Sequence, residues 1–238
     1  MKNTTRLIAA LLLVLPALPS YANEGKAEGH VSIQTRANYS VSTVPENMTV
    51  EEKKARFAQL LLPPLKKVHA ELEGTYEIVR GKISRGDRKG LDKLKKYYEV
   101  ESDEALLAAL KPHPVSIALA QAAMESAWAT SRFIREANNA FGIWSFKSDE
   151  PRIAAGKTRG SKTIWLKRYD SLEESVRDFY KLIARSPAFR EFRQLRLQTD
   201  DPHQLVTKLH RYSEKGSDYG RSLSAIIRQN DFTAFDAG

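Results

Sequence analysis

One acidic residue stands out against its surroundings. Glu125 lies near the end of residues 115–128, VSIALAQAAMESAW, the most apolar segment beyond the N-terminal region. Apolar surroundings raise the pKa of a carboxyl group, and the negative end of a helix dipole acts in the same direction. A carboxylic acid that stays protonated near neutral pH can donate its proton to a glycosidic oxygen. From the residues alone, Glu125 is either such a general acid or a structural side chain paired with Arg132 or Arg135.

Other catalytic chemistries find little support. The sequence contains no Cys, no Gly-rich phosphate loop and no Gly-x-Ser-x-Gly nucleophile elbow. Its histidines are not spaced as metal ligands: His30, His69, His113, His203 and His210. We therefore expect an enzyme that uses neither a metal ion nor a cofactor.

The N-terminal residues have the parts of a secretory signal peptide. Lys2 and Arg6 are followed by an unbroken apolar run at 7–15, and Ser20-Tyr21-Ala22 provides small residues for cleavage. The run is short for a bilayer span, so a retained anchor is the weaker alternative. We predict a signal peptide at 1–22, export to the periplasm or cell envelope, and no stable membrane insertion after cleavage.

The charge of the chain favours an acidic environment. The formal net charge is +9, and removal of Lys2 and Arg6 would leave +7. A basic exported protein suits a polyanionic cell envelope, whereas a nucleic acid partner is disfavoured by export and by the lack of a binding motif. Nothing in the sequence identifies a protein partner.

The rest of the chain is predicted to be a flexible N-terminal segment, called the lead, followed by one folded domain. Hydrophobic residues make up 42% and charged residues 28%, which is typical of a soluble globular protein. Residues 23–48 are polar and predict a flexible lead, and 49–238 predict the folded domain. Thr49 is placed to cap a first helix, which Pro63-Pro64 should interrupt before a second amphipathic segment.

A short β-type stretch separates two helical regions. Residues 115–128 predict a buried helix, because they are apolar nearly all round. Aromatic and β-branched residues then favour strands at 141–146 and 162–169, joined by a long basic loop. Helical patterns resume at Ser171, which forms a capping box with Glu174. The fold class predicted is α+β, mostly α.

Five ordered segments carry a family resemblance. Residues 120–128, AQAAMESAW, resemble the AQAALESGWG-type signature of bacterial N-acetylglucosaminidases, which include flagellar and autolytic peptidoglycan hydrolases. Residues 139–143, NAFGI, resemble the family's Asn-Leu-Phe-Gly-Ile segment. The other similar segments are Tyr169–Ser175, Ser186–Phe189, and Tyr212-Ser213 with Asp218-Tyr219. Among family members, the chain resembles the Bax-like periplasmic proteins.

The resemblance implies a fold, a reaction and a site. It implies a lysozyme-like fold, with a helical lobe and a small β lobe flanking a glycan-binding groove. The implied activity is cleavage of the β-1,4 bond after N-acetylglucosamine in peptidoglycan glycan strands, with Glu125 as general acid. Tyr212 is expected to be a polar contact in the catalytic cleft, and Tyr219 lies near it. The groove floor would be shaped by Asn139, Phe141 and Gly142.

The second catalytic group is less well defined. A partner carboxylate lies about 5–5.5 Å from the acid in retaining glycosidases and about 6.5–9.5 Å away in inverting ones. Between residues 138 and 168 the acidic residues are Asp149 and Glu150. We select Glu150, with Asp149 second, although both can be solvated loop charges and the substrate's N-acetyl group can replace a protein nucleophile. Ala127 and Ala129 also stand where the family commonly has glycine.

Three other functions remain open on the sequence alone. The same groove can bind peptidoglycan with weak or no turnover, which the uncertain second carboxylate allows. A muramidase would use the same acid on the other glycosidic bond. A scaffold would position other wall enzymes through its basic face. A buried acid at Glu125 favours catalysis over these binding functions, because a pure binder has no need of it.

Overall fold

The computed structural model describes residues 39–159 and 162–236, so the predicted signal peptide and most of the predicted lead lie outside the described residues. The elements in chain order are α1 (Val50–Ser84), α2 (Leu91–Tyr98), α3 (Asp103–Leu110), α4 (Val115–Glu125), α5 (Arg132–Ala137), β1 (Arg152–Arg159), β2 (Lys162–Lys167), α6 (Leu172–Arg185), η1 (Pro187–Phe189), α7 (Arg190–Arg196), α8 (Pro202–Leu205), η2 (Val206–Leu209), α9 (Ser217–Gln229) and η3 (Phe232–Phe235). The predicted class, α+β and mostly α, is confirmed. None of the helices in these ranges is long and apolar enough to cross a membrane.

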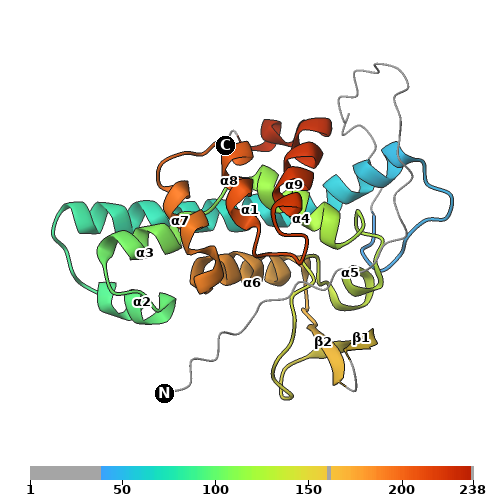
Figure 1. The fold of residues 1–238 in the computed structure, drawn as a ribbon, viewed down its shortest axis with the longest axis horizontal. Coiled ribbons are helices and arrows are strands. Elements are labelled where there is room, and N and C mark those ends of the chain that lie inside the picture. The colour runs from blue at the N-terminus through green and yellow to red at the C-terminus, as the bar shows by residue number, and fades with distance from the viewer. Residues whose placement is uncertain (1–38, 160–161, 237–238) are drawn as a thin grey trace.

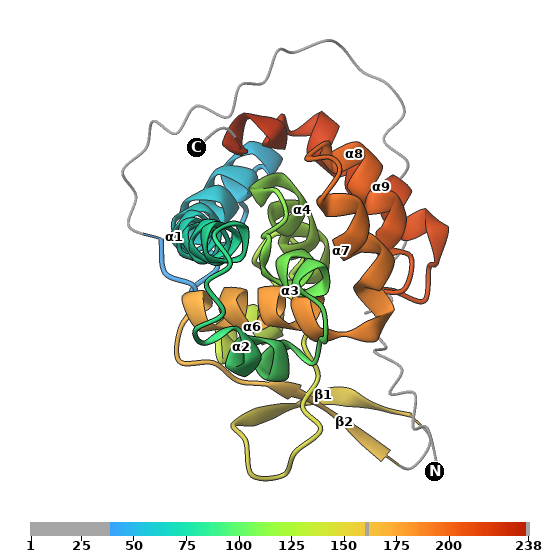
Figure 2. The same cartoon turned by 90° about the vertical axis from the view of Figure 1, so that its left-hand side faces the viewer.

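The helices form one lobe and the two strands a second, smaller one. α6 lies across the lower side of the helical lobe, and the hairpin of β1 and β2 lies beyond it (Figure 1, Figure 2). α1 runs the length of the helical lobe and packs against α3, α4 and α6. This is the lobe arrangement expected of a lysozyme-like fold, with the short helix α5 between the helix that ends at Glu125 and the β lobe.

α1 is a single helix, and the predicted interruption at Pro63-Pro64 is wrong. Thr49 forms the expected capping box with Glu52, and the helix continues for 35 residues through both prolines. Each proline removes a backbone hydrogen bond and crowds the preceding turn, at a cost of about 3 kcal/mol. Apolar side chains on both sides of the prolines enter one core, namely Phe57, Leu61, Leu62, Leu65 and Val68. Burial of about 1.5–3 kcal/mol for each large side chain outweighs the local cost.

The β lobe differs in part from the prediction. Lys162–Lys167 is a strand as expected, but its partner is Arg152–Arg159, which lies in the predicted loop. Residues 141–146 contribute only an isolated bridge from Trp144 to Leu166 and flanking backbone hydrogen bonds. The register of the hairpin shifts between Ala154 and Thr158. The periodicity of residues 141–146 reflects burial in a bent segment rather than a strand.

An apolar contact and a polar one attach the β lobe to the helices. Ala155, Ile164 and Leu166 form one face of the hairpin and pack on Phe133 of α5. The side-chain amide of Asn139 donates to the carbonyl of Lys167 at the end of β2, at 2.9 Å. The segment between α5 and the hairpin is therefore held at both ends.

Candidate active site

Glu125 is the last residue of α4. The nine residues from Val115 to Ala123 are all buried, whereas the Glu125 side chain is partly exposed. α4 thus carries Glu125 from the centre of the core to the edge of the helical lobe. The predicted buried helix is confirmed, although it ends three residues earlier than the apolar pattern.

A left-handed turn follows Glu125. Ala127, Trp128 and Ala129 have φ values of 54°, 60° and 60°, which costs an L-residue roughly 1–2 kcal/mol each. Ser126 stabilises the turn, because its hydroxyl donates to the Ala122 carbonyl at 2.6 Å and accepts from the Ala129 amide at 2.9 Å. Glycine would adopt this turn without strain.

A buried cation fixes the end of this turn. Arg56 of α1 is completely buried, and its guanidinium donates to the Ala129 carbonyl at 2.8 Å. The same group donates to the carbonyls of Ser40 at 2.8 Å and Thr43 at 2.9 Å. Residues 40–43, assigned to the flexible lead, are therefore tied through Arg56 to the turn that follows Glu125. No spacing pattern in the sequence pairs Arg56 with Ala129, 73 positions further along the chain.

The Glu125 carboxyl group has a specific partner in α9. The Tyr219 hydroxyl donates to Oε1 of Glu125 at 3.0 Å, and Gln121 Nε2 donates to the Tyr219 oxygen at 3.1 Å. Burial raises the pKa of Tyr219, so its phenol keeps the proton that it donates. Gln121 lies one turn before Glu125 on the same face of α4, and this spacing is the signal that could have identified it.

Close packing holds α9 in this position. Gly220, next to Tyr219, lies so near η2 that a Cβ atom there would come within 2.5 Å of the Val206 carbonyl oxygen. Only glycine permits this approach without a backbone shift. The Tyr219 hydroxyl is thereby kept within hydrogen-bonding distance of Glu125.

The setting of Glu125 changes its acidity. Burial raises its pKa from 4.5 to about 7, and this increase is opposed by the Tyr219 hydrogen bond and by the positive charge of Lys215. Arg132 is engaged elsewhere, with Glu136 and with the Ala154 carbonyl. The carboxyl group therefore holds a proton near neutral pH, as a general acid requires.

The segment after α5 forms the other side of the site. Gly142 has φ +65°, and a Cβ atom there would lie 3.8 Å from Oε2 of Glu125. Asn139 is buried and shapes this segment from within, since its amide exchanges hydrogen bonds with the Ile143 backbone at 3.0 Å. The Phe141 ring is buried and stacks on Phe179, with centroids 4.0 Å apart. The structure thus places Gly142 beside the acid, and Asn139 and Phe141 behind it.

The two tyrosines have different partners. Tyr212 and Tyr219 are both buried and stack on each other, with ring centroids 5.4 Å apart. The Tyr212 hydroxyl donates to the Phe141 carbonyl at 3.1 Å, so it supports the segment that carries Gly142. Tyr219, rather than Tyr212, is the tyrosine hydrogen-bonded to the Glu125 carboxyl group.

A groove runs from Gly142 to Glu150, one of the two candidate second carboxylates. Its volume is about 530 Å³, and Gly142, Tyr212 and Glu150 are among the residues that line it. Glu150 accepts a hydrogen bond from Ser145 at 2.8 Å and lies 4.0 Å from the Lys167 ammonium group. Asp149 is exposed on the loop. Glu125 is therefore not hydrogen-bonded to either candidate, and Glu150 is the one placed in the groove wall.

The residues present can supply acid–base chemistry. Among the described residues, no group of three or more His, Asp or Glu side chains is arranged to hold a metal ion. A helix-borne carboxyl group with a pKa of about 7, open on one side and next to a groove, is the kind of site found in hydrolases that protonate a leaving group.

The sequence agrees with this class. The profile of the glucosaminidase family, described as mannosyl-glycoprotein endo-beta-N-acetylglucosaminidase, matches residues 104–232, more than half of the chain. The chain belongs to this family of glycoside hydrolases. The family resemblance and the enzyme class predicted from the motifs are both confirmed.

The chain is also similar to individual proteins. The chain is 31% identical over 165 residues to Protein bax of Escherichia coli strain K12, an alignment that covers 63% of this chain and 58% of that protein. The chain thus spans less than two thirds of that relative's length. Solved structures with a similar fold include a peptidoglycan hydrolase from Sphingomonas sp. A1 (TM-score 0.44, 22% identity, 60% of this chain and 96% of that chain). The catalytic domain of the autolysin Auto from Listeria monocytogenes has a TM-score of 0.44 and 22% identity, covering 60% and 87%.

Proposed function

We propose that this protein is a peptidoglycan hydrolase that cleaves the β-1,4 glycosidic bond after N-acetylglucosamine. The observation that carries the proposal is the Glu125 carboxyl group, whose pKa is raised to about 7 and which lies beside Gly142, a residue of the groove wall. Membership of the glucosaminidase family supports the reaction class, and the wall-hydrolase names of the similar proteins support the substrate.

Glu125 is proposed as the general acid. In the first step it donates its proton to the oxygen that leaves the anomeric carbon, so the C–O bond breaks without forming an alkoxide. The Tyr219 hydroxyl then stabilises the resulting carboxylate through the hydrogen bond it already makes. Tyr212 does not contact the reacting atoms. It is a positioning residue, because its hydroxyl holds the Phe141 carbonyl and thus the backbone beside Gly142.

Glu150 is proposed as the second catalytic group, with Asp149 as the alternative. Glu150 supports this role because it lines the groove that begins at Gly142, whereas Asp149 is exposed. If Glu150 acts as nucleophile or base, Glu150→Gln lowers kcat by at least a hundredfold, while Asp149→Asn keeps near-normal turnover. If kcat falls in neither variant, the nucleophile is the N-acetyl group of the substrate.

Location and domain limits are proposed from the sequence. Residues 1–22 would direct export to the periplasm or cell envelope, and 49–238 would form the catalytic domain. The hydrogen bonds of Arg56 to residues 40–43 add part of the lead to the folded unit.

The test is to incubate the processed protein with purified peptidoglycan and to identify new reducing ends by mass spectrometry. Glu125→Gln is the matched variant, since it keeps the shape of the side chain and removes the acidic proton. Reducing N-acetylglucosamine released only by the unmodified protein supports the proposal. Reducing N-acetylmuramic acid would indicate a muramidase, and wall binding without release by either protein would indicate a binding module.

A further inference from the structure

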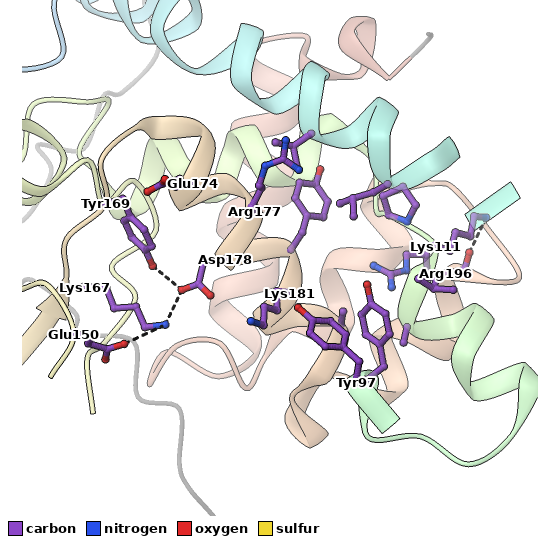
Figure 3. Close-up of a pocket in the computed structure, with 18 of the residues that line it drawn as sticks. Tyr97, Lys111, Glu150, Lys167, Tyr169, Glu174, Arg177, Asp178, Lys181 and Arg196 are labelled. Carbon is purple, nitrogen blue, oxygen red and sulfur yellow. Dashed lines mark hydrogen bonds and ion pairs between the residues drawn. The ribbon is translucent and has the colours of Figure 1, made fainter. Parts of the chain in front are cut away.

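A second groove lies next to the first, on an adjacent face of α6. It has a volume of about 540 Å³ and runs between α1, α2, α6 and the base of the β lobe (Figure 3). Residues common to the walls of both grooves are Glu150, Lys167, Asp178 and Lys181. The two grooves therefore meet at one rim, where Asp178 accepts hydrogen bonds from Lys167 and Tyr169, each at 2.8 Å (Figure 3).

The second groove has an excess of positive charge. Its lining includes six cationic side chains, Lys111, Lys167, Arg168, Arg177, Lys181 and Arg196, against three carboxylates, Glu150, Glu174 and Asp178. Within residues 39–159 and 162–236, no carboxylate forms an ion pair with Arg168, Lys181 or Arg196, whereas the other three cations are paired. The unpaired cations favour an anionic ligand.

Arg196 is the most unusual of these cations. Its side chain is 1% exposed, and its guanidinium donates to the Ala108 carbonyl at 2.7 Å while Nε has no hydrogen-bond partner. Burial lowers the pKa of this guanidinium to about 9. A buried cation without a counter-ion is costly unless an anion approaches it, and the groove is the open path to it.

An aromatic side chain faces the same groove. Tyr97 of α2 is 48% exposed, and the Lys181 ammonium group lies 5.4 Å from the centre of its ring. The ring and the ammonium group together offer an apolar surface beside a charge, as Figure 3 shows for Tyr97 and Lys181. Three carboxylates in the lining disfavour a polyanion such as a phosphate polymer. A short peptide with both carboxylate and amino groups matches this combination of cationic and acidic side chains in the groove wall.

We propose that the second groove binds the acidic stem peptide that branches from the glycan strand, while the strand itself occupies the groove beside Glu125. The proposal rests on the proposed function, because it assigns the strand to the first groove. The shared rim gives a branch a direct path from one groove to the other. α1 and α2 precede residue 104, so these walls lie outside the segment that defines the family.

Binding of an isolated peptide tests the proposal without requiring hydrolysis. The probe is the pentapeptide N-acetyl-L-Ala-γ-D-Glu-L-Lys-D-Ala-D-Ala with free carboxyl groups, titrated calorimetrically into the whole processed protein; the acetyl group replaces the amide link to the glycan and leaves the peptide with a net negative charge. Arg168→Gln and Tyr97→Ala alter only the second groove, and each should weaken binding about tenfold, equivalent to 1.4 kcal/mol. Lys93→Gln removes an exposed cation of α2 that lines neither groove, and it should bind like the unmodified protein. The peptide with its carboxyl groups amidated should not bind.

A second measurement links the groove to turnover. Arg168→Gln should lower kcat/KM about tenfold on intact peptidoglycan and leave it unchanged on glycan strands freed of peptides by an amidase. Equal loss on both substrates, or equal affinity for the free and the amidated peptide, would overturn the proposal. If the protein binds the pentapeptide as described but releases no glycan fragments, the proposed function fails and the peptide site stands.

Discussion

The guanidinium of Arg56 and the carbonyl of Ala129 are 2.8 Å apart, and this hydrogen bond joins the first helix to the turn that follows Glu125. Ala129 is the last of three consecutive residues with positive φ. The acid is therefore held from two directions, by α4 before it and by Arg56 after it.

Replacement of Arg56 by Met should loosen this turn. The carbonyls of Ala129, Ser40 and Thr43 would lose their donor, which should lower the free energy of unfolding by about 3 kcal/mol. Because the position of Glu125 then varies, kcat should fall roughly tenfold or more with a smaller change in KM. Urea denaturation and steady-state kinetics measure the two effects. Arg80→Met, which removes an exposed ion pair with Glu77, should change neither by a comparable amount.

Replacement of Tyr219 by Phe should shift the pH dependence of the reaction. The Tyr219 hydrogen bond lowers the pKa of Glu125, so its loss should move the pKa above about 7. The alkaline limb of the kcat profile should then move upward by somewhat less than one pH unit, as expected for a bond of about 1 kcal/mol. Tyr212→Phe is the control, since it removes a hydrogen bond to the Phe141 carbonyl and should leave the limb in place. Equal shifts in the two variants would contradict the assigned pairing.

The ionisation of Glu125 should also affect stability. The folded protein binds this proton with a pKa of about 7, whereas the reference pKa of the carboxyl group is 4.5. Between these values the folded state holds the additional proton, so its contribution is complete below pH 4.5 and disappears as the pH rises through 7. Relative to Glu125→Gln, the unmodified protein should lose up to about 3 kcal/mol over this window. Denaturation of both proteins at several pH values measures this. A difference in unfolding free energy that does not change with pH would show that the pKa of the Glu125 carboxyl group is not raised.

Glycine at position 127 should stabilise the protein. Ala127 has φ +54°, a conformation that glycine adopts without strain, so Ala127→Gly should raise the unfolding free energy by up to about 1 kcal/mol. The same change at Ala70, an exposed helical position in α1, should lower it by about 1 kcal/mol. Thermal denaturation compares the two, and destabilisation by Ala127→Gly would contradict the assigned strain.

Local patterns predicted the elements that depend on neighbouring residues. The cap at Thr49, the buried helix before Glu125 and the cap at Ser171 all follow from side chains within four positions. The raised pKa of Glu125 also follows from the apolar residues of its own helix. These features could be predicted because the interactions that produce them are local in the sequence.

Features that depend on distant contacts could not be predicted. The continuation of α1 through Pro63-Pro64 is stabilised by a core assembled from many elements. The partner of β2 was misplaced, because burial of Phe141 and Ile143 in the main core and packing of Trp144 beside the hairpin give residues 141–146 the composition of a strand. The hydrogen bonds of Tyr219 and Arg56 join residues 94 and 73 positions apart, and no spacing rule identifies such pairs.

The length of α1 has a consequence for dissecting the protein. Its apolar side chains occupy the centre of the main core together with those of α4 and α6, yet the family segment begins only at residue 104. A fragment cut to 104–232 would expose the faces of α4 and α6 that α1 covers, and the turn after Glu125 would lose Arg56. The segment that matches the family is thus smaller than the unit able to fold, and a fragment that folds on its own must include α1.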